Sequence, residues 1–108
     1  MESRRDIFQA LADPTRRAII MLLTTGAMTP NALSEHFDTS RQAISKHLHI
    51  LSECEMVTQE PKGREIHYHL NAKKMKEVEK WLEQFKQMIA KKFNQLDDVL
   101  EKLKHNKR

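Results

Sequence analysis

The chain has 108 residues, of which 39% are hydrophobic and 31% charged, which allows one domain with a single modest core. No apolar run approaches the roughly 20 residues of a membrane helix, the first residues do not resemble a secretory signal, and there is one cysteine, so we expect a cytoplasmic protein without disulfides or membrane insertion. The formal net charge of +4 is a poor indicator of nucleic-acid binding, because residues 1–72 hold 8 Lys/Arg against 9 Asp/Glu and the excess lies in residues 73–108, with 11 against 6.

The N-terminal part of the chain predicts three short helices. The first extends over about residues 4–12, and Ser3 can cap it. Its apolar side is formed by Ile7, Phe8 and Leu11. The next two helices begin with the same signal, Asp13-Pro14 and Thr29-Pro30, in which an N-cap residue precedes a proline at the first helical position. The second helix is apolar nearly all round, so we expect it at the centre of the core.

A longer helix is predicted at about residues 40–54. Thr39 and Gln42 form the T-x-x-Q pattern of a capping box. One face is apolar at helical spacing and contains Ala43, Ile44, Leu48 and Leu51. The other face lacks acidic residues between Asp38 and Glu53 and contains Ser40, Arg41, Gln42, Ser45, Lys46 and His49. Such a helix suits the DNA major groove, so with the short helix before it this segment predicts a DNA-binding helix-turn-helix.

A β-hairpin is predicted at about residues 56–70, with strands near residues 56–60 and 66–70. Alternation in the second strand places Ile66, Tyr68 and Leu70 toward the core and His67 and His69 toward solvent. The turn over residues 61–64 carries Lys62 and Arg64. A hairpin with a basic tip beside a helix-turn-helix is typical of a winged fold, in which the tip contacts phosphates and adds affinity more than sequence information.

The last helix is predicted over about residues 72–103, with Asn71 as its cap. At about 1.5 Å per residue it would span roughly 45 Å, too far for so small a core to cover. Its heptad a and d positions are apolar, with Lys92 as the one interruption: Met75, Val78, Leu82, Phe85, Ile89, Leu96, Val99 and Leu103. A second copy of the chain is the simplest partner, although the first half of the helix could instead fold back on its own domain.

These segments resemble the ArsR/SmtB family of bacterial winged helix-turn-helix repressors, in its non-metal-sensing, autorepressor-like branch. The resemblance is carried by ALADPTRRAIIMLL, LSEHFDTSRQAISKHLHILSECEMV and KGREIHYHL. It covers residues 5–72 closely and the last helix only by length and character. It implies a mainly α fold with a small hairpin wing, and a homodimer that binds a palindromic operator in double-stranded DNA and represses transcription.

The resemblance also implies site residues. The DNA-binding set is Ser40, Arg41, Gln42, Ser45, Lys46, His47, His49, Lys62 and Arg64. The dimer interface, joined through the first and last helices, is Ile7, Phe8, Leu11, Met75, Val78, Leu82, Phe85, Ile89 and Leu96. Neither a cofactor nor a metal is expected, because the paired-cysteine and Asp/His metal motifs of many relatives are missing.

Cys54-Glu55 stands where the family usually has Ala-Gly. A lost glycine costs on the order of 1 kcal/mol if the position is left-handed. Cys54 is interpreted as a small core residue rather than a redox switch. His67 and His69 share one face of a strand, but two nitrogens are fewer than a zinc site needs.

Other functions are less well supported by the sequence. No nucleophile, phosphate-loop or Cys/His signature of an enzyme is found. A metal- or thiol-responsive derepressor of the same family stays open, as does a protein-interaction module on a winged-helix scaffold. Arg16 and Arg17 either touch the DNA backbone or solvate the second helix. The sequence does not reveal the operator, the regulated genes, the effector or whether the protein represses or activates.

Overall fold

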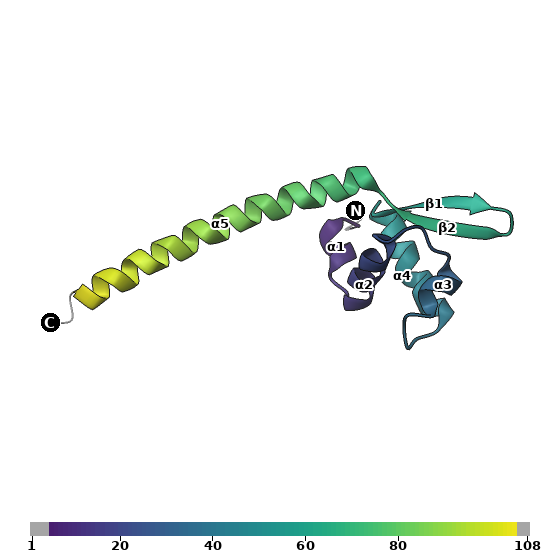
Figure 1. Cartoon of the computed structure of the whole chain (residues 1–108), viewed down its shortest axis with the longest axis horizontal. Coiled ribbons are helices and arrows are strands. Elements are labelled where there is room, and N and C mark those ends of the chain that lie inside the picture. Colours follow the sequence, from purple (N-terminus) through teal and green to yellow (C-terminus); the bar gives the residue numbers. More distant parts are fainter. Residues whose placement is uncertain (1–4, 106–108) are drawn as a thin grey trace. The chain divides into compact units, whose positions relative to one another are not determined.

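The computed structural model describes residues 5–105 and confirms a mainly helical winged helix-turn-helix with a hairpin wing and a long C-terminal helix (Figure 1). The elements are α1 (Ile7–Leu11), α2 (Pro14–Leu23), α3 (Pro30–Ser34), α4 (Arg41–Glu53), β1 (Val57–Lys62), β2 (Glu65–Leu70) and α5 (Ala72–His105). They divide into two compact units, one ending at Met75 and the other beginning at Lys76. The first unit holds the helix-turn-helix and the wing, and the second holds most of α5.

The two cap-and-proline signals are confirmed. The carboxylate of Asp13 accepts two backbone N–H groups at the start of α2, and the hydroxyl of Thr29 accepts one at the start of α3. A proline is the first helical residue in both cases, where its missing N–H costs no hydrogen bond. Beyond the end of α2, Gly26 adopts a φ of +146°, which favours glycine.

The N-caps of α1 and α4 are not the residues that the sequence predicts. Asp6 caps α1, and Ser3 lies outside the described residues. At α4 the prediction of Thr39 as the cap is wrong, because the Ser40 hydroxyl accepts the N–H of Ala43 at 3.1 Å. Ser40 has the extended backbone of an N-cap (φ −74°, ψ 155°) directly before the first helical residue. Thr39 and Ser40 both favour the N-cap position, so the predicted N-cap of α4 is one residue too early.

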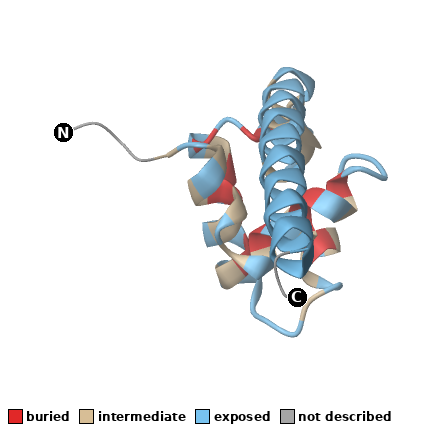
Figure 2. Ribbon diagram, turned by 90° about the vertical axis from the view of Figure 1, so that its left-hand side faces the viewer, coloured by how far each residue is buried: buried red, intermediate tan, exposed pale blue. Residues whose placement is uncertain are grey.

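The core lies among the first four helices and the base of the wing (Figure 2). Its completely buried large side chains are Ile19, Leu33, Ile44, Leu48, Leu51, Cys54 and Met56. As predicted, α2 lies in the core through Ile19, Ile20 and Leu23, but it is not packed on all sides, since Met21 is 67% exposed. The packing partners of α2 (α1, α4 and β2) leave Met21 uncovered.

The wing is a two-stranded antiparallel hairpin with a turn of only two residues. Its register pairs Lys62 with Glu65, so residues 63–64 form the turn and Lys62 belongs to β1. The predicted four-residue turn is therefore wrong. Gly63 has a φ of +62°, which matches the positive φ that tight hairpin turns require.

The predicted inward side of β2 is only partly covered. Tyr68 and Leu70 are half-buried, but Ile66 is 41% exposed. Ile66 lies near the end of the hairpin that extends away from the helices (Figure 1). Backbone hydrogen bonds between Tyr68 and Met28 attach the middle of β2 to the segment before α3.

The helix α5 runs for 34 residues and ends at His105, slightly beyond the predicted boundary. The Asn71 side chain accepts backbone N–H groups at its start, as predicted. None of its described residues is buried, and the rings of Trp81 and Phe85 stack with centroids 5.1 Å apart. No described helix is long and apolar enough to span a membrane.

Candidate nucleic-acid interface

The helix α4 has one buried face and one polar face because its apolar residues recur every three or four positions. The buried face packs through Ile44, Leu48 and Leu51. The remaining turns expose most of the residues predicted to bind DNA: Ser40, Arg41, Gln42, Ser45, Lys46 and His49. Packing of the apolar face therefore holds this polar face outward on a short rigid helix.

Several side chains on this polar face are available to an external partner. Between residues 5 and 105, no hydrogen bond or ion pair engages the side chains of Arg41, Gln42, Ser45 and Lys46. The Ser40 hydroxyl is used in the helix cap. Arginine and glutamine are suited to base edges and lysine to phosphates, so the face combines both kinds of contact.

At the end of α4 the charges are compensated. Glu53 lies 3.2 Å from His49 Nε2 and 3.4 Å from Arg5 Nε. Arg5 and His49 also line an open hollow of about 420 Å³ together with Lys46. Arg5 therefore joins this surface as a cation that the sequence analysis did not identify, because the contact with Glu53 joins residues far apart in the sequence.

The wing brings a second arginine to the beginning of α4. Arg64 and Arg41 both line a hollow of about 170 Å³, which Asn31 of α3 and Ile66 of β2 also line. In the described part of the chain the Arg64 side chain makes no hydrogen bond or ion pair. The wing and the helix-turn-helix thus bring Arg41 and Arg64 to one hollow, which Glu65 also lines.

Lys62, the other predicted cation of the wing, is paired. Its Nζ lies 3.4 Å from Glu60 Oε1, and His69 Nε2 lies 3.0 Å from the same oxygen. The hydrogen bond from His69 and the charge of Lys62 hold the pKa of the exposed Glu60 carboxyl below its ordinary value. His67 lies 3.7 Å from Glu65. The two histidines pair with different glutamates, and both are half-buried rather than fully exposed to solvent as predicted.

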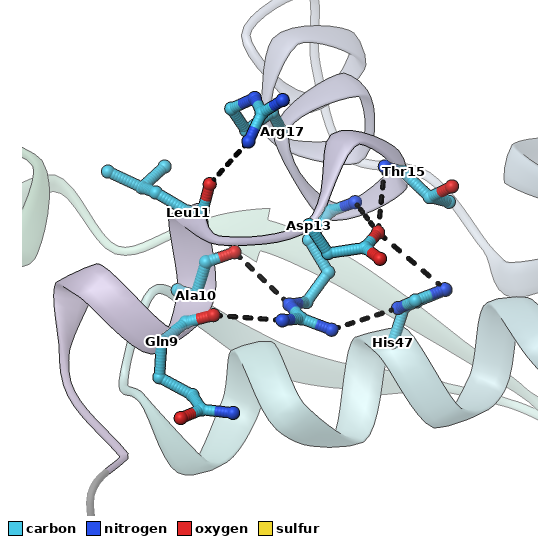
Figure 3. Close-up of polar contacts among 8 residues, drawn as sticks. Gln9, Ala10, Leu11, Asp13, Thr15, Arg17 and His47 are labelled. Carbon is cyan, nitrogen blue, oxygen red and sulfur yellow. Dashed lines mark hydrogen bonds and ion pairs between the residues drawn. The ribbon is translucent and has the colours of Figure 1, made fainter.

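Arg16 and His47 occupy different positions from those the sequence suggested. Arg16 is only 7% exposed, and its guanidinium donates to the carbonyls of Gln9 (2.9 Å) and Ala10 (3.1 Å) at the end of α1 (Figure 3). Its Nη1 lies 3.3 Å from His47 Nδ1. His47 is half-buried and directed toward α2 rather than grouped with the exposed polar residues of α4. Arg16 is therefore an internal connector, so neither alternative considered for it holds.

Asp13 completes this group. Its carboxylate accepts the backbone N–H groups of Thr15 and Arg16 and lies 3.9 Å from His47 Nε2 (Figure 3). Burial raises the pKa of the Asp13 carboxyl, but the two backbone hydrogen bonds and the nearby His47 ring and Arg16 guanidinium outweigh it, so the pKa lies below its ordinary value. Asp13 is thus held ionised against the start of α2.

Cys54 lies in the core, as predicted, with 1% of its surface exposed. Burial raises the pKa of its thiol, so little reactive thiolate forms near neutral pH. Within residues 5–105 no group of three or more His, Cys, Asp or Glu residues is arranged to hold a metal ion.

Comparisons with known proteins agree with this geometry. Residues 2–60 match the family described as a helix-turn-helix domain. The transcriptional repressor SdpR of Bacillus subtilis (strain 168) is 40% identical over 80 residues, which are 74% of this chain and 89% of SdpR. The crystal structure of a possible transcriptional regulator for arsenical resistance superposes with a TM-score of 0.70 at 35% identity, covering 80% of this chain and 95% of that one. A crystal structure of an ArsR family transcriptional regulator gives a TM-score of 0.68 at 33% identity, covering 78% and 92%. The chain therefore belongs to the ArsR/SmtB family of winged helix-turn-helix transcriptional regulators, which are not enzymes.

Proposed function

We propose that the protein is a homodimeric transcriptional repressor that binds a palindromic operator in double-stranded DNA in the cytoplasm. The observation that carries this proposal is the polar face of α4, where Arg41, Gln42 and Lys46 are exposed and make no polar contact with the rest of the described chain. These solvated side chains can exchange water for base edges and phosphates without breaking any contact within the protein. The similarity to SdpR, a transcriptional repressor, supports repression as the outcome.

The contacts divide into two classes. Arg41, Gln42 and Ser45 lie near the beginning of α4 and read base edges in the major groove. The remaining contacts go to phosphates, from Ser40, Lys46, His49, Lys62 and Arg64. His47 belongs to the predicted set, but its half-buried position favours an indirect role.

Dimerisation uses the apolar stripe of α5 together with α1. The stripe residues Leu82, Phe85 and Leu96 are each about half exposed, as is Phe8 of α1 (49%). The other proposed interface residues are Ile7, Leu11, Met75, Val78 and Ile89. A 34-residue helix without a buried residue is marginal unless a partner covers its apolar side. A two-fold axis would then place two reading helices in half-sites roughly 34–36 Å apart.

Fluorescence anisotropy and light scattering test the proposal together. The full chain is titrated onto a labelled duplex from upstream of its own gene and onto a shuffled duplex, across a range of salt concentrations. We expect tighter binding to the upstream duplex, with two chains per duplex, and a dimer at micromolar concentration without DNA. A monomer that binds neither duplex at low salt would refute the proposal and favour a protein-interaction module.

A further inference from the structure

One buried side chain joins three helices of the DNA-binding unit. Arg16, from α2, donates Nη2 to the carbonyl of Gln9 and Nε to the carbonyl of Ala10, and both acceptors belong to α1. The third contact, from Nη1, goes to His47 on α4 at 3.3 Å. A guanidinium offers donors in a fixed planar arrangement. Its plane therefore sets how the end of α1 lies relative to the side of α4.

The chemistry of this contact fixes the proton on His47. Arginine has no acceptor, so in the neutral ring this hydrogen bond requires His47 Nδ1 to accept, which leaves the ring proton on Nε2. That nitrogen lies 3.9 Å from Asp13 Oδ2. Asp13 in turn accepts the N–H groups that begin α2. The imidazole thus lies between the guanidinium of Arg16 on one side and the carboxylate of Asp13, the N-cap of α2, on the other (Figure 3).

We propose that Arg16 and His47 are positioning residues for DNA recognition: they fix α4 against α1 and α2, and so set operator affinity without touching DNA. The inference rests on the proposed function, because α4 is the proposed reading helix. It also gives a physical connection between the two proposed interfaces. A displacement of α1, on the dimer side, moves the carbonyls that hold Arg16, and Arg16 transmits the displacement to α4.

The neighbouring arginine supplies a matched comparison. Arg17 also holds the end of α1, since its Nη1 donates to the carbonyl of Leu11 at 2.7 Å. However, Arg17 is exposed, and its described contacts do not reach α4. The two residues therefore share identity, helix and type of acceptor, and differ in burial and in the connection to His47. If attachment of α1 by an arginine of α2 were what operator binding requires, both positions would lose affinity, whereas the positioning role predicts a loss at Arg16 alone.

The test is a set of single and double variants of the full chain, measured by operator anisotropy well below the unfolding temperature of each variant. We expect His47→Ala to weaken operator binding about tenfold, as lost positioning of a contact surface does. His47→Gln should recover most of the affinity, because an amide oxygen accepts from Arg16 while its NH₂ faces Asp13. Arg16→Lys should behave like His47→Ala, and Arg17→Lys should stay within twofold of the wild type.

The double variant separates positioning from direct contact. If His47 acts through Arg16, Arg16→Lys combined with His47→Ala loses no more affinity than either change alone. Additive losses would overturn the proposal, because they would mean that His47 contacts DNA independently. Equal losses in Arg17→Lys would also overturn it. If Arg16→Lys fails to fold, the operator affinities of His47→Ala and His47→Gln still test the positioning role, since both variants keep the hydrogen bonds from Arg16 to α1.

A second measurement needs no DNA. Nitrogen-15 spectra of the imidazole rings distinguish the two neutral tautomers, and we expect His47 to carry its proton on Nε2, with the preference reduced in Arg16→Lys. A proton on Nδ1 in the wild type would overturn the proposal. If the wild type bound no operator yet showed the Nε2–H tautomer, the proposed function would fail while the connection between α2 and α4 would stand.

Discussion

Glu55 occupies a backbone position that favours glycine. Its φ is +61°, and it closes α4 in a Schellman arrangement. The N–H of Met56 donates to the carbonyl of Leu51 (2.9 Å), and the N–H of Glu55 donates to that of Ser52 (3.0 Å). We therefore predict that Glu55→Gly stabilises the protein, even though it removes a charged side chain.

The expected change in the free energy of unfolding for Glu55→Gly is the sum of three contributions. A left-handed conformation costs a residue with a side chain about 1–2 kcal/mol. Glycine gives the unfolded chain more freedom, which offsets about 0.4–1 kcal/mol of that gain. The Glu55–Lys74 pair is 3.9 Å long and its carboxylate is mostly exposed, so its loss costs between about 0 and 1 kcal/mol. The expected net gain is about 0.5 kcal/mol, or roughly 2–4 °C in unfolding midpoint for a chain of this size.

Thermal and urea unfolding followed by circular dichroism measure this difference at one fixed protein concentration, since the proposed dimerisation would make the midpoint depend on concentration. Glu55→Ala is the matched control, because it removes the same carboxylate and the same pair with Lys74 but keeps a Cβ in the left-handed conformation. We expect Gly to be more stable than Ala by about 1 kcal/mol. Equal stability of the two variants would refute the strain argument.

Four further outcomes are expected. Arg41→Ala should reduce discrimination between operator and shuffled DNA about tenfold, measured by competition anisotropy. Arg64→Ala should weaken binding to both duplexes about equally and reduce the salt slope by about 1; a change in discrimination would contradict its assignment to phosphate. Because the folded pKa of Asp13 is lowered, its stabilising effect is complete above the unfolded pKa and is lost as the pH falls through the folded pKa. Asp13→Asn should therefore flatten the acid side of the stability profile, and an unchanged profile would contradict this. Leu82→Glu should convert the dimer into a folded monomer in light scattering, and a persistent dimer would place the interface elsewhere.

The sequence predicted best what short-range chemistry determines. Asp13 and Thr29 cap helices because each precedes a proline that can only begin a helix, and the periodicity of α4 fixed which side of it packs. Prediction from the sequence failed where two neighbouring residues favour the same capping role, and where two residues in contact are far apart in the sequence. Thr39 and Ser40 both favour capping, so the sequence does not distinguish between them. Arg16 meets a partner 31 positions away, and no local pattern predicts such a contact.

The wing shows why counting basic residues overstates the charge available to DNA. Lys62 and His69 share the carboxylate of Glu60, whereas Arg64 has no partner among residues 5–105. An exposed pair such as Lys62–Glu60 is weakened by solvent screening, so a phosphate can displace Glu60 at low cost, but the carboxylate stays nearby and repels the phosphate. Arg64 is not ion-paired to Glu65, which lines the same hollow, and its guanidinium can hold a phosphate through two hydrogen bonds. Substituting Arg64 should therefore cost more affinity than substituting Lys62, and Glu60→Gln should raise affinity for any duplex while leaving discrimination unchanged. A loss of affinity in Glu60→Gln, measured by the same anisotropy assay, would mean that Glu60 orients Lys62 for its contact instead of competing with DNA.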